Sequence, residues 1–326
     1  MTAERVGAAV RRLTTLLADQ GVETARLDAE LLVAHVLGSD RSRLFLSPDR
    51  SLSAAQEHAL ADVVRRRTED RESIAHLLGV RGFRYLDLAV DRRALIPRPE
   101  TELLVELALE LPAGATVIDV GTGSGAIALA VADERPDLTV HATDVSPDAL
   151  ALARENALRL GSSVTFHEGD LLAGVGENPD ASYLAILSNP PYIPLGEHDE
   201  LPPEVRRHDP HLALFGGDDG LDVIRRLIPA AWNAGADVLA IEVGQGQPPA
   251  VVDLLADAGF AHTEVRDDLA GIGRVVVGWR DRADDGGETD DRDAHDRDGS
   301  GEHVTGDSGA GSVGEGGDAA QERGGV

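Results

Sequence analysis

The strongest constraint on the fold is an alternation of apolar strands and helices that begins near residue 115 and continues to 279. Short apolar runs alternate there with longer segments whose apolar residues recur at helical spacing. Parallel strands need a crossover that a helix can supply, so this order predicts an open, mainly parallel α/β sheet. The last strand is expected to be antiparallel. We expect strands at 116–120, 138–143, 164–167, 183–187, 238–243, 260–266 and 274–279, and helices at 127–132, 147–160, 221–232 and 248–258.

The N-terminal part, residues 1–75, has a different pattern and is expected to be a small all-helical bundle. Apolar side chains recur at helical spacing, and Ser53 with Gln56 has the form of a capping box. Irregular residues rich in glycine and aromatics predict a hairpin linker at 76–96, ahead of the sheet domain at 97–280. By sequence alone, the bundle is as readily a structural appendage as a domain that docks a partner.

The last segment, 281–326, differs in composition from the rest. It contains 14 acidic residues and 4 arginines, a net charge of −10, and its few large aliphatic residues show no periodicity. A segment of this kind cannot bury enough apolar surface to offset the entropy of folding. It is therefore expected to be a disordered acidic tail rich in glycine and aspartate.

Composition also limits the class of function. The net charge of −28 repels a nucleic-acid backbone, so no stable nucleic-acid binding is expected. No apolar run approaches the ~20 residues that a membrane span needs. The first 17 residues form an amphipathic helical pattern rather than a signal peptide, which favours a cytoplasmic location without membrane association. The absence of cysteine excludes disulfides, thiolate metal sites and cysteine nucleophiles.

The first strand of the sheet leads into a glycine-rich turn, Asp119-Val120-Gly121-Thr122-Gly123-Ser124-Gly125. Three alternate glycines let the backbone turn tightly and approach a ligand beside the free N–H groups of the following helix. The spacing is G-x-G-x-G rather than G-x-G-x-x-G, which makes a pyrophosphate ligand less favoured. Asp119, just inside the strand end, can orient the loop or contact a ligand ammonium group.

Acidic residues also follow the next two strands. Asp144 lies 23 positions after Gly121, where a carboxylate can accept hydrogen bonds from both hydroxyls of a ribose. Asp170 and Leu171 follow the third strand. There Asp170 can accept a hydrogen bond from an adenine amine, and Leu171 can pack on the ring. Together with the glycine loop, these residues predict a nucleoside ligand that does not require phosphates.

The fourth strand ends in Asn189-Pro190-Pro191-Tyr192. Each proline has a fixed φ and lacks an N–H, so the chain must leave the sheet stiffly. The side-chain amide of Asn189 and the backbone carbonyls of Asn189 and Pro190 form an acceptor-rich corner. Such a corner can hold an –NH2 group by its two hydrogens. An ordinary loop is the alternative, since Asn-Pro dipeptides are common at turns.

Taken together, these motifs resemble the class I methyltransferases that use S-adenosylmethionine. Within that class the chain is similar to the release factor glutamine methyltransferases, the protein-(glutamine-N5) methyltransferase family. The resemblance extends over residues 1 to about 280, and its most discriminating part is Leu95-Ile96-Pro97-Arg98-Pro99-Glu100-Thr101-Glu102. Two late motifs also match, Glu242-Val243-Gly244-Gln245-Gly246-Gln247 and Asp268-Leu269-Ala270-Gly271. Two positions depart from the family pattern. The family usually has glutamate where this chain has Asp209, and an acidic residue where this chain has Gly273.

The resemblance implies a Rossmann-like methyltransferase sheet, S-adenosyl-L-methionine as the cofactor, and peptide chain release factors as substrates that residues 1–75 help to dock. It implies methylation of the side-chain nitrogen, N5, of the glutamine in the factor's Gly-Gly-Gln loop. The implied cofactor-binding residues are Asp119, Gly121, Thr122, Gly123, Ser124, Gly125, Asp144, Asp170, Leu171 and Asn189. The implied substrate-binding residues are Asn189, Pro190, Pro191 and Tyr192, of which Asn189, Pro190 and Tyr192 are the catalytic ones.

Two alternatives stay open. The first is an amino-methyltransferase with another substrate, such as a ribosomal protein glutamine or adenine N6 of nucleic acid. Base methylation would need base flipping and a basic groove, which the acidic charge disfavours. The second is a non-catalytic cofactor-binding module that docks a partner. No metal is expected, because the histidines at 198, 208 and 211 lie in a polar loop without ligand spacing.

Overall fold

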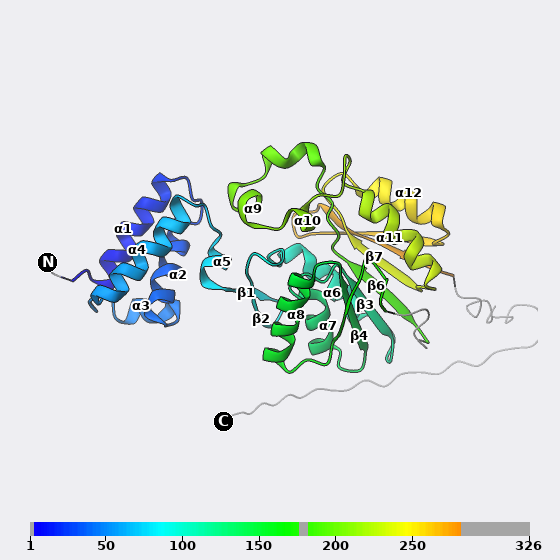
Figure 1. The fold of residues 1–326 in the computed structure, drawn as a ribbon, viewed down its shortest axis with the longest axis horizontal. Coiled ribbons are helices and arrows are strands. Elements are labelled where there is room, and N and C mark those ends of the chain that lie inside the picture. The colour runs from blue at the N-terminus through cyan, green and yellow to red at the C-terminus, as the bar shows by residue number, and fades with distance from the viewer. Residues whose placement is uncertain (1–2, 176–181, 282–326) are drawn as a thin grey trace, which may run out of the picture. The chain divides into compact units, whose positions relative to one another are not determined.

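The N-terminal part is helical, as predicted, in the computed structural model, which describes residues 3–175 and 182–281 (Figure 1). Its helices are α1 (Val6–Asp19), α2 (Ala25–Leu37), α3 (Arg41–Leu46), α4 (Ala54–Thr68) and α5 (Ile74–Leu78). They share one apolar core, in which Leu13, Leu17 and Leu32 are fully buried. The predicted capping box is present at the start of α4: Ser53 Oγ accepts from Gln56 N, and Gln56 Oε1 accepts from Ser53 N.

A short hairpin follows the bundle, as expected from the glycine- and aromatic-rich sequence. It consists of β1 (Val80–Phe83) and β2 (Leu86–Ala89), which pair in antiparallel orientation. After it, the 3-10 turn η1 (Pro99–Thr101) leads directly into α6 (Glu102–Leu109). Proline suits the first position of η1, because no N–H is needed at that position. The block around Thr101 is thus separated from the first strand of the main sheet by one helix, α6.

The main sheet has seven strands in the order β5-β4-β3-β6-β7-β9-β8 among the described residues. β9 is antiparallel to both β7 and β8, while the other neighbouring strands pair in parallel. The prediction of a mainly parallel α/β sheet with an antiparallel last strand is therefore confirmed. The strands are β3 (Thr116–Val120), β4 (Thr139–Asp144), β5 (Thr165–Glu168), β6 (Leu184–Ser188), β7 (Val238–Glu242), β8 (His262–Asp267) and β9 (Gly273–Trp279).

Two helical layers cover the sheet, because its central strands are apolar on both faces. Val117 of β3 packs with α6 and α7 (Ala126–Glu134) in one core cluster, whereas its neighbour Ile118 packs with α11 (Asp222–Asn233) and α12 (Pro248–Ala258) in another. Figure 1 shows α7 and α8 (Pro147–Leu160) on the side of the sheet away from α11 and α12. Within the described ranges, no helix is long and apolar enough to span a bilayer.

The segment between β6 and α11 contains three short helical turns, although its sequence pattern suggested a polar loop. They are η2 (Leu195–Glu200), α9 (Pro203–His208) and α10 (His211–Leu214). Turns of this length are too short to show a hydrophobic period in the sequence. The predicted tail at 281–326 lies, apart from Asp281, outside the described residues.

A buried ion-pair cluster connects the bundle to this segment. The guanidinium of Arg67 in α4 lies 2.9 Å from Asp28 Oδ2 and 2.9 Å from Glu204 Oε1 in α9. The Asp70 carbonyl oxygen also lies 2.8 Å from His208 Nε2. α9 begins only eleven positions after Tyr192, so the cluster ties the bundle to the chain that leaves the Asn-Pro-Pro-Tyr corner.

Candidate functional site

The glycine loop, Asp144 and the Asn-Pro-Pro-Tyr corner meet at one edge of the sheet. Val120, the last residue of β3, pairs with Thr143 of β4 and Ser188 of β6, so the residues that follow these strands are neighbours. The strand order also reverses between β3 and β6, which is where open α/β sheets bind ligands. A cavity of about 400 Å³ lies there. The predicted site residues that line it are Gly121, Thr122, Gly123, Ser124, Asp144, Asp170, Leu171, Asn189, Pro190 and Pro191.

The glycine loop needs its glycines for backbone conformation. Gly121, Gly123 and Gly125 have φ values of +74°, +57° and +87°, a region that other residues rarely adopt. Gly125 does not line the cavity. A Cβ there would lie 2.9 Å from Leu129 Cδ1 and 3.3 Å from the Cβ of Ala153, so this glycine permits close packing beneath the loop.

Asp119 lies behind the glycine loop rather than in the cavity lining. Its Oδ2 accepts hydrogen bonds from Thr122 Oγ1 at 2.6 Å and from Ala128 N at 3.2 Å. The side chain is fully buried, and its Oδ1 has no hydrogen-bond partner among the residues that the structure describes. Burial raises the pKa of Asp119 to about 7, against the effect of the two hydrogen bonds. The geometry fits the loop-orienting role, while contact with a ligand ammonium group stays a prediction.

The free energy of unfolding is expected to rise as the pH falls from 8 to 6, by roughly 1–3 kcal/mol. Burial raises the pKa of both Asp119 and Glu242 to about 7, above the values near 4 of exposed carboxyls. The folded state therefore binds protons more tightly than the unfolded chain, and it loses stability as the pH rises through 7. Urea denaturation at the two pH values measures the change. A double variant, Asp119→Asn with Glu242→Gln, should lack most of it, and an identical pH dependence in that variant would contradict this assignment.

Asp144 stands at the end of β4 with its carboxylate in the cavity lining. Its Oδ2 accepts a hydrogen bond from Gly123 N at 2.9 Å, and its Oδ1 accepts one from Ser146 N at 2.8 Å. Burial raises its pKa, partly offset by these backbone N–H groups. Each carboxylate oxygen can accept a further hydrogen bond, so the group can hold the glycine loop and still accept from ligand hydroxyls.

Asp170 and Leu171 also line this cavity. The Asp170 carboxylate is half exposed and is paired with the guanidinium of Arg226. Leu171 has a φ of +55°, and its carbonyl oxygen accepts a hydrogen bond from Thr143 Oγ1 at 2.7 Å. A non-glycine residue in the left-handed region costs energy, and such residues cluster at functional sites. The predicted contacts of these two residues with an adenine ring stay predictions.

The Asn-Pro-Pro-Tyr corner presents two hydrogen-bond acceptors. Ser188 Oγ donates to the Val120 carbonyl at 2.7 Å, which fixes the end of β6 against β3. Asn189 Nδ2 then donates to Thr101 Oγ1 at 3.1 Å. Within the described residues, neither Asn189 Oδ1 nor the Pro190 carbonyl oxygen accepts a hydrogen bond. Both acceptors thus remain available at the border of the cavity.

Tyr192 lies in the lining of a second cavity of about 400 Å³ rather than in the first. Asn189 lines both cavities, and the second also contains Arg98, Glu242 and Arg274. The Tyr192 hydroxyl lies 3.4 Å from Glu242 Oε1, to which it can donate a long hydrogen bond. Burial, followed by the neighbouring Glu242 carboxyl, raises the pKa of Tyr192 well above its usual range. Tyr192 is therefore a neutral phenol at the border of the second cavity.

Three residues that the sequence patterns left without a role hold the corner in place. A Cβ on Gly216 would lie 2.4 Å from the Pro191 carbonyl oxygen, and one on Gly220 would lie 2.1 Å from the Tyr192 carbonyl oxygen. Gln247 Nε2 donates to the same Tyr192 oxygen at 2.9 Å. Three glycines within 216–220 were the signal that a close backbone approach occurs there.

Replacing Gly220 by alanine is expected to lower the free energy of unfolding by about 2 kcal/mol or more. The Cβ would clash with the Tyr192 carbonyl oxygen, in addition to the strain of a φ of +79°. Gly235 is the matched control, because its φ is +80° and a Cβ there meets nothing within 4 Å. Chemical denaturation should find Gly235→Ala clearly less destabilised than Gly220→Ala. Equal losses would mean that the contact with Tyr192 contributes nothing.

The two departures from the family pattern both have a structural account. Asp209 is buried and lies 3.2 Å from the guanidinium of Arg98, and burial raises its pKa to about 6. Arg274 is paired with Asp268 at 2.9 Å instead of with a preceding acidic residue. Gly273 has little room for a side chain, because a Cβ would lie 2.9 Å from Val265 Cγ1. Asp209 therefore joins the predicted Pro-Arg-Pro block to the chain after the corner.

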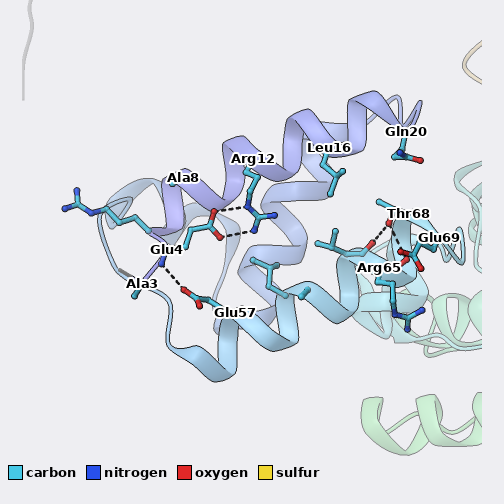
Figure 2. A pocket seen from close by; sticks show the side chains of 14 residues that line it. Ala3, Glu4, Ala8, Arg12, Leu16, Gln20, Glu57, Arg65, Thr68 and Glu69 are labelled. Carbon is cyan, nitrogen blue, oxygen red and sulfur yellow. Dashed lines mark hydrogen bonds and ion pairs between the residues drawn. The ribbon is translucent and has the colours of Figure 1, made fainter. Parts of the chain in front are cut away.

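A larger hollow of about 980 Å³ lies on the bundle, between α1 and α4 (Figure 2). Two of its charged groups, Arg12 and Glu4, are already paired with each other. Arg12 donates two hydrogen bonds of 2.9 Å to Glu4, whose backbone N–H donates to Glu57 Oε1 at 2.8 Å. Arg12 also lowers the pKa of Glu4. The sheet edge, where the free acceptors of Asn189 and Pro190 border one cavity with Asp144, is the candidate active site.

Comparison with known proteins finds two matching families. Residues 8–79 match the PrmC N-terminal domain family, and residues 99–200 match the methyltransferase small domain family. The catalytic domain of hMettl16, 14% identical, has a TM-score of 0.50 over 71% of this chain and 82% of its own, a likeness of fold.

Several relatives carry the name release factor glutamine methyltransferase. The one from Geobacter sulfurreducens is 42% identical over 80% of this chain and 92% of its own length. The one from Deinococcus radiodurans is also 42% identical, over 81% of this chain and 94% of its own. Identity at this level over almost the whole length of both relatives identifies the chain as a methyltransferase that belongs to the release factor glutamine methyltransferase family.

Proposed function

We propose that the protein transfers a methyl group from S-adenosyl-L-methionine to the side-chain nitrogen, N5, of the glutamine in the Gly-Gly-Gln motif of peptide chain release factors. Membership of the family supports the substrate class. The observation that carries the chemistry is the pair of available acceptors, Asn189 Oδ1 and the Pro190 carbonyl oxygen, at the border of the cavity. A primary amide has two N–H groups, and each oxygen of this pair can accept a hydrogen bond from one of them.

The residues at the sheet edge fit the proposed cofactor. A volume of about 400 Å³ is within the usual range of small-molecule sites. Three arginines line this cavity, and each is paired with an acidic side chain: Arg93 with Asp91 and Glu155, Arg98 with Asp209, and Arg226 with Asp170. Paired arginines favour a nucleoside without phosphates. We assign Asp144 to the ribose hydroxyls, Asp170 and Leu171 to the adenine, and the glycine loop to close backbone contact, with Asp119 behind it.

The main task of the proposed site is alignment. S-adenosylmethionine, when bound, supplies an electrophilic methyl group. The glutamine nitrogen is a poor nucleophile, because its lone pair is delocalised into the carbonyl group. Asn189 Oδ1 and the Pro190 carbonyl oxygen each accept a hydrogen bond from one N–H of the glutamine amide. These two bonds direct the nitrogen lone pair toward the methyl group and weaken its delocalisation into the carbonyl group. Correct placement of two reactants can supply roughly 7–11 kcal/mol in favourable cases.

Removal of the amide proton requires no dedicated catalytic base in the site. In the transfer, the nitrogen would bond to the methyl carbon while the bond from that carbon to the sulfonium sulfur breaks and a neutral thioether leaves. The resulting cationic amide would then lose one proton to solvent, because that proton is far more acidic than before. No strong base is needed ahead of the attack. Pro191 stiffens the corner, and Tyr192, a neutral phenol, packs on the substrate amide or shields it from water. We further propose that residues 1–75 dock the release factor and that the enzyme acts in the cytoplasm.

The substrate class is tested by offering the purified enzyme labelled S-adenosylmethionine with four acceptors in parallel: a release factor, ribosomal protein, RNA and DNA. Label is expected in the release factor at about one methyl per chain. A release factor whose Gly-Gly-Gln glutamine is replaced by alanine is the control and should remain unlabelled. Label in RNA or DNA would instead support the base-methylating alternative, and label in no acceptor would support the non-catalytic one.

A further inference from the structure

We propose that Arg67 and Glu204 are positioning residues that fix the orientation of the helical bundle relative to the Asn-Pro-Pro-Tyr corner. A protein substrate held by the bundle then presents its glutamine at the corner. This inference rests on the proposed function, in which residues 1–75 dock the release factor. A docking domain raises the local concentration of the bound segment at a site only when the geometry between the two is suitable. A contact that fixes this geometry contributes to recognition of the whole factor without touching it.

Helix α9 is held by the bundle at two points. Arg67 Nη1 donates to Glu204 Oε1 at 2.9 Å, and Arg71 Nη2 lies 2.8 Å from the same oxygen. One turn further along α9, His208 Nε2 lies 2.8 Å from the Asp70 carbonyl oxygen. A carbonyl oxygen can only accept, so the ring nitrogen is the donor. Glu204 and His208 are four positions apart and therefore share one face of α9, the face toward the bundle.

Helix α9 also borders the candidate site. Val205 lines the second cavity together with Asn189 and Tyr192. Asp209, the residue that follows α9, lies 3.2 Å from the guanidinium of Arg98, which lines both cavities. Helix α9 is thus a short connection between the bundle and the wall of the cavity beside the corner. Contacts that fix α9 against the bundle therefore fix the bundle relative to that cavity.

Arg67 makes this connection from inside the protein. Its side chain is 9% exposed, and its Nε donates to Asp28 Oδ2 at 2.9 Å within the bundle. A buried ion pair contributes little net stability, because the cost of removing the charges from water offsets their attraction. Any other placement of α9, however, would take Glu204 away from Arg67 and leave the buried guanidinium short of one partner. The pair therefore selects one arrangement more than it stabilises the fold.

The apolar contact between the bundle and the sheet domain is small. The two parts have separate apolar cores, and a cluster of Ala75, Val90 and Ile96 joins α5 to the chain after the hairpin. Apolar contact has no preferred direction, whereas each hydrogen bond of Arg67 has one. The three-residue cluster keeps the two parts together, and the ion pairs fix how they are oriented.

The kinetic test uses Glu204→Met in the full-length enzyme, which removes the acceptor on α9 and leaves Arg67 paired with Asp28. The KM for a release factor should rise about 10-fold or more, whereas kcat at saturating factor should stay within about twofold. A peptide of about ten residues around the Gly-Gly-Gln motif lacks the rest of the factor, so its kcat/KM should stay within about twofold. Glu200→Met, exposed and four positions earlier, is the matched control. An unchanged KM for the factor, or equal losses for factor and peptide, would overturn the inference.

A distance measurement tests the orientation without any substrate. The chain contains no cysteine, so Leu46→Cys in α3 and Leu158→Cys in α8 can carry two spin labels, and these leucines are 81% and 85% exposed. Pulsed electron paramagnetic resonance should give a narrow distance distribution in this background and with Glu200→Met, and a broader one with Glu204→Met. Equal widths would overturn the inference. Glu204→Gln keeps a neutral acceptor, should lie between the two, and decides the comparison if Glu204→Met does not fold. Failure of the wild-type enzyme to label the factor would overturn the proposed function and leave the distance result standing.

Discussion

Replacing Asn189 by alanine is expected to lower kcat for methylation of a release factor on the order of 10²- to 10³-fold, the usual cost of one oriented hydrogen-bonding group at a reacting centre. The change removes the Oδ1 acceptor but leaves the Pro190 carbonyl and the rigid backbone of the corner. One of the two substrate N–H groups then has no partner, and the nitrogen lone pair is no longer directed at the methyl group. Quenched-flow measurement of a single turnover gives the rate of the methyl-transfer step itself.

Cofactor binding is the control for this variant. Asn189 is one of many residues in the cavity lining, so S-adenosylmethionine should still bind, with an affinity that is reduced but measurable by calorimetry. Asn189→Ala should also keep its Tm within a few degrees, since the lost hydrogen bond to Thr101 is half-buried and single. A variant that binds the cofactor and transfers methyl groups at the wild-type rate would contradict the role assigned to the corner.

Replacing Asp144 by alanine is expected to weaken binding of S-adenosylmethionine about 100-fold or more. Two ribose hydroxyls would lose a charged acceptor, and hydrogen bonds to charged groups contribute about 1.5–3 kcal/mol each. The carboxylate also accepts from Gly123 N and Ser146 N, so its removal loosens the glycine loop as well. Isothermal titration calorimetry with the cofactor measures the loss directly.

Asp148 provides a control for the Asp144 variant, because it is four residues away and exposed in the first turn of α8. Asp148→Ala changes the net charge equally and should bind the cofactor nearly as tightly as the wild type. Asp144→Asn keeps one acceptor oxygen and should fall between the wild type and Asp144→Ala. Equal affinities for Asp144→Ala and Asp148→Ala would remove Asp144 from the proposed ribose site.

The strands and the helices of the sheet domain were predictable because their apolar patterns are long. The core residues Val117 and Ile118 face opposite helical layers, as a strand buried on both faces requires. The positive φ values of Gly121, Gly123 and Gly125 account for the glycine loop, which the sequence also indicated. Once β3, β4 and β6 are parallel neighbours, their ends must lie together, so the sequence predicted which loops share a cavity. The ligand contacts assigned to those loops stay predictions.

Other features depend on contacts between distant segments and left no local pattern. The turns η2, α9 and α10 are too short for a period, and their positions depend on partners such as Arg67 and Arg98. Glu242 looked like one residue of a late motif. Its contact with the Tyr192 hydroxyl, 50 positions earlier, exists only because β7 is the neighbour of β6 in the sheet. The packing of Gly220 on the Tyr192 carbonyl is likewise a property of the folded chain.

The proposed reaction is tested most directly by locating the transferred methyl group. A release factor is incubated with the enzyme and S-adenosylmethionine, digested, and analysed by tandem mass spectrometry. The proposed function predicts one additional methyl group on the side-chain nitrogen of the Gly-Gly-Gln glutamine, and almost none when Asn189→Ala replaces the wild-type enzyme under the same conditions. An unmodified glutamine, or a methyl group on another residue of the factor, would contradict it.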